Sequence, residues 1–210
     1  MIHEIHPVGP LRMNCSILGD ENSHEAIVVD PGDEVDGLLL RLGRLGLKVK
    51  QIVLTHAHID HAGGAMQMKR ATGAPLLLHE QDFELLCALP DQARWLGAPE
   101  PESVIIDKPL AEGDTVSFGP YTAKVLHTPG HTMGSICLYF EAEKLLIAGD
   151  TLFAGSVGRT DLPGGSSEAL MRSLEEKLSK LPDAVAVVPG HGPTTTIGDE
   201  KLDNPYMRFD

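Results

Sequence analysis

The stretch THAHIDH at residues 55–61 decides the fold and the chemistry of this sequence. It places three imidazoles and a carboxylate within seven residues, directly after the apolar run QIVL at 51–54. The run predicts a strand, so the polar side chains lie where open α/β sheets place their chemistry. Imidazole and carboxylate ligands together suit Zn, Fe or Mn better than Mg or Ca. The alternative is a polar loop of solvated histidines, and the rest of the chain has to supply the missing ligands.

Three further strand ends carry residues that can bind a metal. They are strand 122–126 before HTPGHT at 127–132, strand 144–148 before Gly149-Asp150, and strand 184–188 before Pro-Gly-His at 189–191. A single Pro-Gly-His turn is a weak indication, because histidine is common in turns. Together with the first cluster, the chain offers five histidines and two aspartates at strand ends, which is enough for two metals that share a ligand.

Strand-like and helix-like patterns alternate along the whole chain. Besides the strands named above, we expect strands at 27–30, 75–79, 115–118 and 135–140, and helices at 35–45, 63–71, 81–89 and 167–181. The helix at 81–89 is expected to end at Pro90, and the polar tail 194–210 to wrap the surface. Strands gather in both halves with helices between them, which suits two sheets flanked by helices in one domain over residues 1–210.

Composition excludes several classes of partner. The 210 residues carry a formal net charge of -13, with no window of concentrated Lys and Arg, so nucleic acid and anionic membrane surfaces are disfavoured. No segment is long and apolar enough to span a bilayer, and the N-terminus lacks a secretory pattern. The three cysteines are odd in number and widely spaced, which favours free thiols in the cytoplasm.

The four strand-end motifs resemble those of the metallo-β-lactamase superfamily, and the resemblance extends from Asp30 to residue 191. It implies an α/β (α+β) protein folded as a four-layer αβ/βα sandwich, with the metals at one edge of the two sheets. It also implies two divalent ions, with Zn preferred and Fe or Mn accepted by the same ligands. The implied ligands are His56, His58 and His131 for one metal, Asp60, His61 and His191 for the other, and Asp150 as a bridge together with a hydroxide. Asp30 resembles a structural aspartate of the family, and the alternative is a turn carboxylate that caps Gly32.

Two motifs are most similar to those of the glyoxalase II group, namely HTPGHT at 127–132 and AGDTLFAGSVGR at 148–159. This similarity implies a thioesterase that cleaves S-2-hydroxyacylglutathione or a related small-molecule thioester. Glyoxalase II carries a C-terminal helical glutathione-binding domain, and we expect none here. Its basic residue and the Tyr two positions on correspond to Arg159 and Asp161, so the cation is kept and the Tyr is replaced. Arg159 is the candidate for binding a substrate carboxylate, and the alternative is a solvated loop arginine.

The ligand set leaves the reaction open among three classes. In a hydrolase, Asp150 bridges the metals, Asp60 can orient or shuttle a proton, and the thiolate departs without a general acid. A mono-iron persulfide dioxygenase would use His56, His131 and Asp150. A non-hydrolytic di-iron redox protein would need a separate flavin partner.

Overall fold

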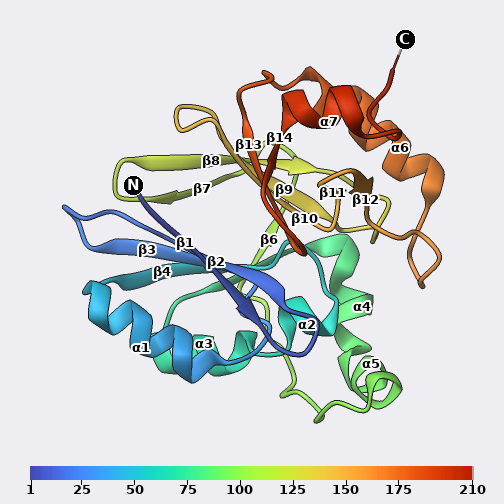
Figure 1. The fold of residues 1–210 in the computed structure, drawn as a ribbon. Coiled ribbons are helices and arrows are strands. Elements are labelled where there is room, and N and C mark those ends of the chain that lie inside the picture. Colours follow the sequence, from blue (N-terminus) through green and yellow to red (C-terminus); the bar gives the residue numbers. More distant parts are fainter. Residues whose placement is uncertain (210) are drawn as a thin grey trace.

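Two six-stranded sheets face each other and carry helices on their outer faces (Figure 1). The computed structural model describes residues 1–209. The first sheet consists, in spatial order, of β1 (Ile2–Val8), β2 (Met13–Gly19), β3 (Glu25–Val29), β4 (Lys48–Val53), β5 (Leu76–His79) and β6 (Lys108–Leu110). The second consists of β14 (Thr195–Thr196), β13 (Ala186–Pro189), β10 (Leu145–Gly149), β9 (Ile136–Phe140), β8 (Tyr121–His127) and β7 (Thr115–Phe118). A small hairpin pairs β11 (Leu152–Phe153) with β12 (Ser156–Val157).

Helices complete the outer layers. The helices are α1 (Val35–Leu45), α2 (Ile59–Ala62), α3 (Ala65–Thr72), α4 (Phe83–Cys87), α5 (Leu89–Leu96), α6 (Ser167–Glu176) and α7 (Ile197–Asp203), with short 3₁₀ turns at Glu80–Asp82 and Leu178–Lys180. The first sheet is covered by α1 and α3, and the second by α6 and α7 (Figure 1). This arrangement confirms the predicted four-layer αβ/βα sandwich. No helix among residues 1–209 is long and apolar enough to cross a membrane.

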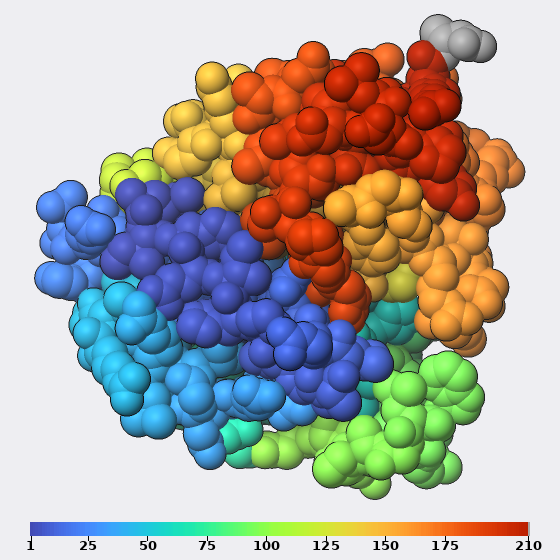
Figure 2. Space-filling view, viewed as in Figure 1, coloured from blue at the N-terminus to red at the C-terminus, as the bar shows by residue number. Residues whose placement is uncertain are grey.

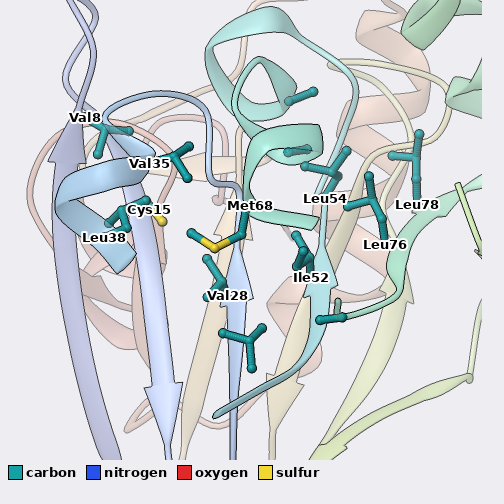
Figure 3. Packing of buried hydrophobic residues seen from close by; sticks show 14 of the residues in the cluster. Val8, Cys15, Val28, Val35, Leu38, Ile52, Leu54, Met68, Leu76 and Leu78 are labelled. Atoms are coloured by element: carbon teal, nitrogen blue, oxygen red, sulfur yellow. The ribbon is translucent and has the colours of Figure 1, made fainter. Parts of the chain in front are cut away.

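The layering follows from the side-chain alternation of the strands. Along β3, Ala26 and Val28 face the helices, whereas Ile27 and Val29 face the other sheet. Figure 3 shows the outer cluster of the first sheet, where Val28 and other strand residues lie beneath Met68 of α3. Because both faces of each sheet are buried, strands such as β3, β9 and β10 are nearly continuous apolar runs.

Two sequence predictions about the path of the chain are wrong. The helix expected over 81–89 does not end at Pro90, because Pro90 lies in the first turn of α5. A proline is tolerated there, since its missing N–H has no partner at a helix start. The tail from residue 194 does not simply wrap the surface, because it forms β14 and α7. The Thr196 hydroxyl caps α7 by accepting a hydrogen bond from Asp199 N at 3.1 Å.

Candidate metal centre

The carboxyl ends of four strands meet at one edge of the sandwich. In the second sheet, β10 is parallel to β13, and both β8 and β10 are antiparallel to β9, so β8, β10 and β13 run in one direction. The segment after β4 joins this edge, because Ile136 N donates a hydrogen bond to Thr55 O at 2.9 Å. The four motifs expected to carry ligands are therefore brought together from both sheets.

The first group of side chains consists of His56, His58 and His131. The distance from His58 Nδ1 is 3.1 Å to His56 Nε2 and 2.8 Å to His131 Nε2. Three ring nitrogens thus point at a common space, and all lie within 4.8 Å of one another. The group matches the ligand set expected for one metal.

The second group consists of Asp60, His61 and His191. Asp60 Oδ2 lies 3.0 Å from His191 Nε2 and 3.7 Å from His61 Nε2. The three ligand atoms again lie within 4.8 Å of one another. The structure therefore assembles the second expected ligand set as well.

Asp150 lies between the two groups. Its Oδ2 is 3.5 Å from His131 Nε2 in the first group and 3.8 Å from His191 Nε2 in the second, and its Oδ1 is 3.4 Å from His61 Nε2. This carboxylate faces the turn after β13, where a Cβ on Gly190 would overlap Asp150 Oδ1. Asp150 is thus placed where a bridging ligand would have to be.

The polar atoms at the centre fit a bound cation. Among the described residues, His61 Nε2 and Asp150 Oδ1 are buried and have no hydrogen-bond partner. Leaving such a group unpaired costs about 1–3 kcal/mol. A divalent ion coordinated by both atoms would remove that cost, and imidazole with carboxylate is a donor set that Zn, Fe and Mn accept.

His56 and His58 of the first group are held in the neutral form that binds metals. Burial and the neighbouring His131 lower the pKa of His58 to about 4. Burial, together with His61 and His131, lowers the pKa of His56 well below its ordinary value. At neutral pH these rings carry free lone pairs, so protons do not compete with a metal for them.

Positive charge is favoured in the second group. Burial alone would lower the pKa of His61, but the carboxylates of Asp60, Asp150 and Asp30 raise it well above its ordinary value. Burial alone would raise the pKa of Asp60, but His61 and His191 lower it. The surplus of carboxylates around His61 therefore attracts a cation, whether a proton or a metal.

Asp30 orients His61. Its carboxylate accepts hydrogen bonds from Thr55 N at 2.7 Å, from Thr55 Oγ1 at 2.7 Å and from His61 Nδ1 at 2.9 Å. With Nδ1 engaged in this way, Nε2 of His61 is left to face the centre. The alternative role as a side-chain cap of Gly32 is not observed, because Gly32 N donates to the backbone oxygen of Asp30.

Backbone carbonyls orient two other histidines. His131 Nδ1 lies 2.8 Å from Arg159 O, and His191 Nδ1 lies 3.2 Å from Leu11 O. A carbonyl only accepts, so each Nδ1 carries the proton and each Nε2 is free for a metal. Asn14 holds the turn that carries His191, because its Nδ2 donates a hydrogen bond to Pro189 O at 3.0 Å.

Sequence reasoning missed Asp82, which is 1% exposed. Its carboxylate accepts hydrogen bonds from Ala57 N at 2.9 Å, Thr132 Oγ1 at 2.8 Å and Gly134 N at 2.6 Å. Burial raises the pKa of Asp82, although these hydrogen bonds lower it in part. Asp82 thus ties the 55–61 segment to the turn that carries His131. The available sequence signal was its place just after the strand expected at 75–79.

A cavity of about 970 Å³ opens over the centre, and candidate ligands from both groups line it. Figure 2 shows the surface hollowed between the green segment that contains α4 and α5 and the orange segment that follows β12. Arg159 lines this cavity as well, but its guanidinium donates from Nε and Nη2 to the carboxylate oxygens of Asp161, at 2.7 Å each. Arg159, the predicted carboxylate-binding residue, therefore lies at the cavity but forms an ion pair with Asp161 of the same loop.

Comparison with known proteins identifies the family to which this site belongs. The model of the metallo-beta-lactamase superfamily matches residues 8–191. The hydroxyacylglutathione hydrolase GloC of Haemophilus influenzae is 39% identical over 206 residues, which cover 97% of each chain. The crystal structure of BLEG-1, a B3 metallo-beta-lactamase, matches with a TM-score of 0.92 at 36% identity, over 99% of this chain and 100% of that one. The crystal structure of TTHA1623 in a di-iron-bound form matches with a TM-score of 0.88 at 39% identity, over 97% and 99% of the two chains.

Proposed function

The chain belongs to the metallo-β-lactamase superfamily, which supports a metal-dependent hydrolase, and we propose that this protein is a thioesterase of the glyoxalase II type. Its substrate would be S-2-hydroxyacylglutathione or a related thioester. The observation that carries the proposal is the pair of ligand groups with Asp150 between them. The likeness to GloC supports the choice of thioester, and the di-iron form of TTHA1623 supports a pair of metals.

We assign the two ligand groups to two divalent ions. His56, His58 and His131 would hold one, Asp60, His61 and His191 the other, and Asp150 would contact both. When bound, such ions supply a water nucleophile near neutral pH and stabilise negative charge that develops on a carbonyl oxygen. Zinc is our preferred metal because it suits this donor set, and iron or manganese fits the same ligands.

Hydrogen bonds within the protein hold the candidate ligands in place before a substrate binds. The hydrogen bonds of Asp30, Leu11 O and Arg159 O fix the imidazole rings, so little reorganisation is needed when a substrate arrives. Asp60 remains ionised at neutral pH because His61 and His191 lower its pKa. The ionised carboxylate is therefore available to bind a metal and to accept a hydrogen bond that orients the attacking water.

The departing group does not need a proton donor. A thiol has a pKa of about 8.5, so the thiolate leaves readily. Among the residues that line the cavity, the ionisable side chains outside the ligand groups are Asp91 and Arg159, and each is in an ion pair. The site thus lacks an evident general acid, which suits a thioester better than an amide.

The rival reaction, oxidation of glutathione persulfide at a single iron, needs only His56, His131 and Asp150. The ligand set fits both reactions, but only a two-metal hydrolase would depend on Asp60, His61 and His191 as metal ligands. Substitution of His191 should therefore separate the two reactions. Its control is His127→Ala, which removes a histidine of the HTPGHT motif that stacks on His79 outside both groups.

The test combines metal analysis with two substrates. Metal-loaded protein is assayed for hydrolysis of S-lactoylglutathione and, with an oxygen electrode, for oxidation of glutathione persulfide. We expect two metals per chain, thioester hydrolysis without oxygen uptake, and loss of one metal and at least 100-fold of kcat/KM in His191→Ala, as expected when one metal of a two-metal site is lost. Oxygen uptake without hydrolysis, with His191→Ala as active as His127→Ala, would refute the proposal.

We also propose a reducing cytoplasm as the location of the protein. Cys15, Cys87 and Cys137 are all free thiols, and Cys87 is exposed rather than buried. Exposed free thiols persist where glutathione and thioredoxin keep them reduced.

A further inference from the structure

We infer that the cavity selects thioesters whose acyl group is an aliphatic chain or an aromatic ring, and that the α4–α5 segment binds this group. The face concerned is called the apolar wall and consists of Leu85, Ala88, Trp95 and Leu96. The inference rests on the proposed function for the type of bond that is cleaved. The inference goes beyond the proposed function because it specifies the acyl group next to the thioester bond.

The apolar wall exposes side chains that core packing does not explain. Trp95 is 73% exposed and Leu96 is 45% exposed, although both are large and apolar. Both line the same cavity as His58, Asp60 and His131 of the ligand groups. An exposed apolar surface that is continuous with a polar reaction centre is typical of a substrate pocket.

The opposite side of the cavity is apolar too. It is formed by Leu11, Phe153, Val157, Leu162 and Pro163. An acyl group that enters between the two sides is removed from water on both faces. The volume of about 970 Å³ is large enough for a chain of several carbons or for a ring beside Trp95.

Charged groups that could hold a glutathione moiety are scarce in this cavity. A glutathione thioester carries a carboxylate at each end of its peptide, and both need cationic or N–H partners. Arg159 is the one cationic side chain among the lining residues described, and its Nε and Nη2 already donate to Asp161. Asp91, the other charged lining residue outside the ligand groups, is paired with Arg94 and offers no donor to a carboxylate. The cavity therefore favours the apolar part of a substrate over the charged part.

The first test is a series of acyl groups on one neutral thiol. Acetyl, butanoyl, hexanoyl and phenylacetyl thioesters of N-acetylcysteamine are compared with S-lactoylglutathione on the metal-loaded protein. We expect kcat/KM to rise up to about fourfold for each methylene that is buried. The hexanoyl and phenylacetyl thioesters should exceed S-lactoylglutathione. A flat series, with S-lactoylglutathione the best substrate, would overturn the apolar wall and leave the proposed function standing.

The second test uses binding, so that it does not depend on catalysis. Trp95 is the single tryptophan of the chain, and its emission therefore reports on the apolar wall alone. A hexyl thioether of N-acetylcysteamine, which cannot be hydrolysed, should shift this emission to shorter wavelength, and a methyl thioether should not at the same concentration. If no thioester is hydrolysed but the hexyl thioether still shifts the emission, the proposed function fails and the apolar wall stands. No shift with either thioether would overturn the apolar wall.

A variant and a matched control locate the effect. Trp95→Ala should lower kcat/KM for the hexanoyl thioester about tenfold and leave that for the acetyl thioester within twofold, as expected when a large apolar contact is lost from the bound chain only. The control is Leu202→Ala on α7, because Leu202 is 72% exposed and is not among the residues that line the cavity. Equal losses for both thioesters in Trp95→Ala, or the same pattern in Leu202→Ala, would contradict the inference.

Discussion

Asp82→Ala tests whether a carboxylate that touches no candidate ligand still holds the metal centre together. The side chain accepts hydrogen bonds from Ala57 N, Gly134 N and Thr132 Oγ1. Ala57 lies between His56 and His58, and Thr132 follows His131, so all three ligands of the first group depend on the segments that Asp82 joins. Its removal should loosen that group in particular.

The magnitude follows from the partners that are left behind. Thr132 Oγ1 keeps Ser135 Oγ at 2.7 Å, so two backbone N–H groups, those of Ala57 and Gly134, lose their acceptor. At about 1–3 kcal/mol for each unpaired group, the free energy of unfolding should fall by about 2–6 kcal/mol. Burial raises the pKa of Asp82, which shows that the buried carboxylate is itself unfavourable. Its removal recovers part of that cost, so we expect the loss of stability to lie toward the lower end of this range.

Glu200→Ala is the matched control. Glu200 is 3% exposed and accepts hydrogen bonds from Gly155 N, Thr195 Oγ1 and Asn204 Nδ2, away from the ligand groups. It should also lower the free energy of unfolding by up to about 2–6 kcal/mol, because Gly155 N and Thr195 Oγ1 lose their acceptor, whereas Asn204 Nδ2 keeps Ser156 O.

The assay is urea unfolding combined with competitive zinc titration against a chelating dye. Loss of a partner that orients metal ligands weakens metal affinity by about 10–100-fold, so the Kd of the first metal should rise by that factor in Asp82→Ala and by less than about twofold in Glu200→Ala. Unchanged zinc affinity in a destabilised Asp82→Ala would refute the reasoning and leave Asp82 as a support of the fold alone.

Three other perturbations have expected outcomes. Gly190→Ala should lower metal content below one ion per chain, measured by plasma emission spectrometry, because the new Cβ would overlap Asp150 Oδ1; a full complement of metal would contradict this. Asp30→Ala should weaken zinc binding about 10–100-fold in the same dye titration, since His61 Nδ1 loses its acceptor; wild-type affinity would show that the ring needs no such partner. Metal-free protein should be most stable in urea near pH 6.5. Stability should rise from pH 4 to 6.5, because the folded pKa of His58 is about 4 and the unfolded chain then binds more protons. It should fall at higher pH, because the raised folded pKa of His61 gives a stabilisation that is lost as the pH rises through it. A monotonic rise of stability up to pH 9 would contradict the assignment for His61.

The sequence was sufficient to predict the layers and to single out the side chains that the structure gathers at one edge, because both depend on local patterns. Continuous apolar runs predicted strands buried on both faces, and each candidate ligand stands directly after such a run. Local patterns did not predict elements that depend on contacts with distant parts of the chain. The strand β1, which was not predicted, has the sequence IHEIHPV and is only half-buried, since it pairs on one side with β2 at the edge of its sheet. Pro90 suggested a helix end, but the same residue type also begins helices.

Asp82 illustrates a second reason for failure. Its partners Thr132 and Gly134 lie 50 and 52 residues further along the chain, and no spacing rule connects them. The carboxylate can form these hydrogen bonds only when β5 lies beside β4 and the turn after β8 lies at the same edge.

Each candidate ligand group draws side chains from both halves of the sandwich. The segment 55–61 from the first sheet contributes to both groups, whereas His131, Asp150 and His191 come from the second sheet. Neither half therefore holds a complete ligand group, and each group closes only when the apolar faces of the two sheets are packed together. The large inter-sheet core that includes Phe118 and Phe140 thus has a chemical role, because it sets the distance across which Asp150 meets the 55–61 segment. A metal bound at these groups would therefore stabilise the packing of the two sheets, since ions that bind only the folded chain stabilise that state by mass action.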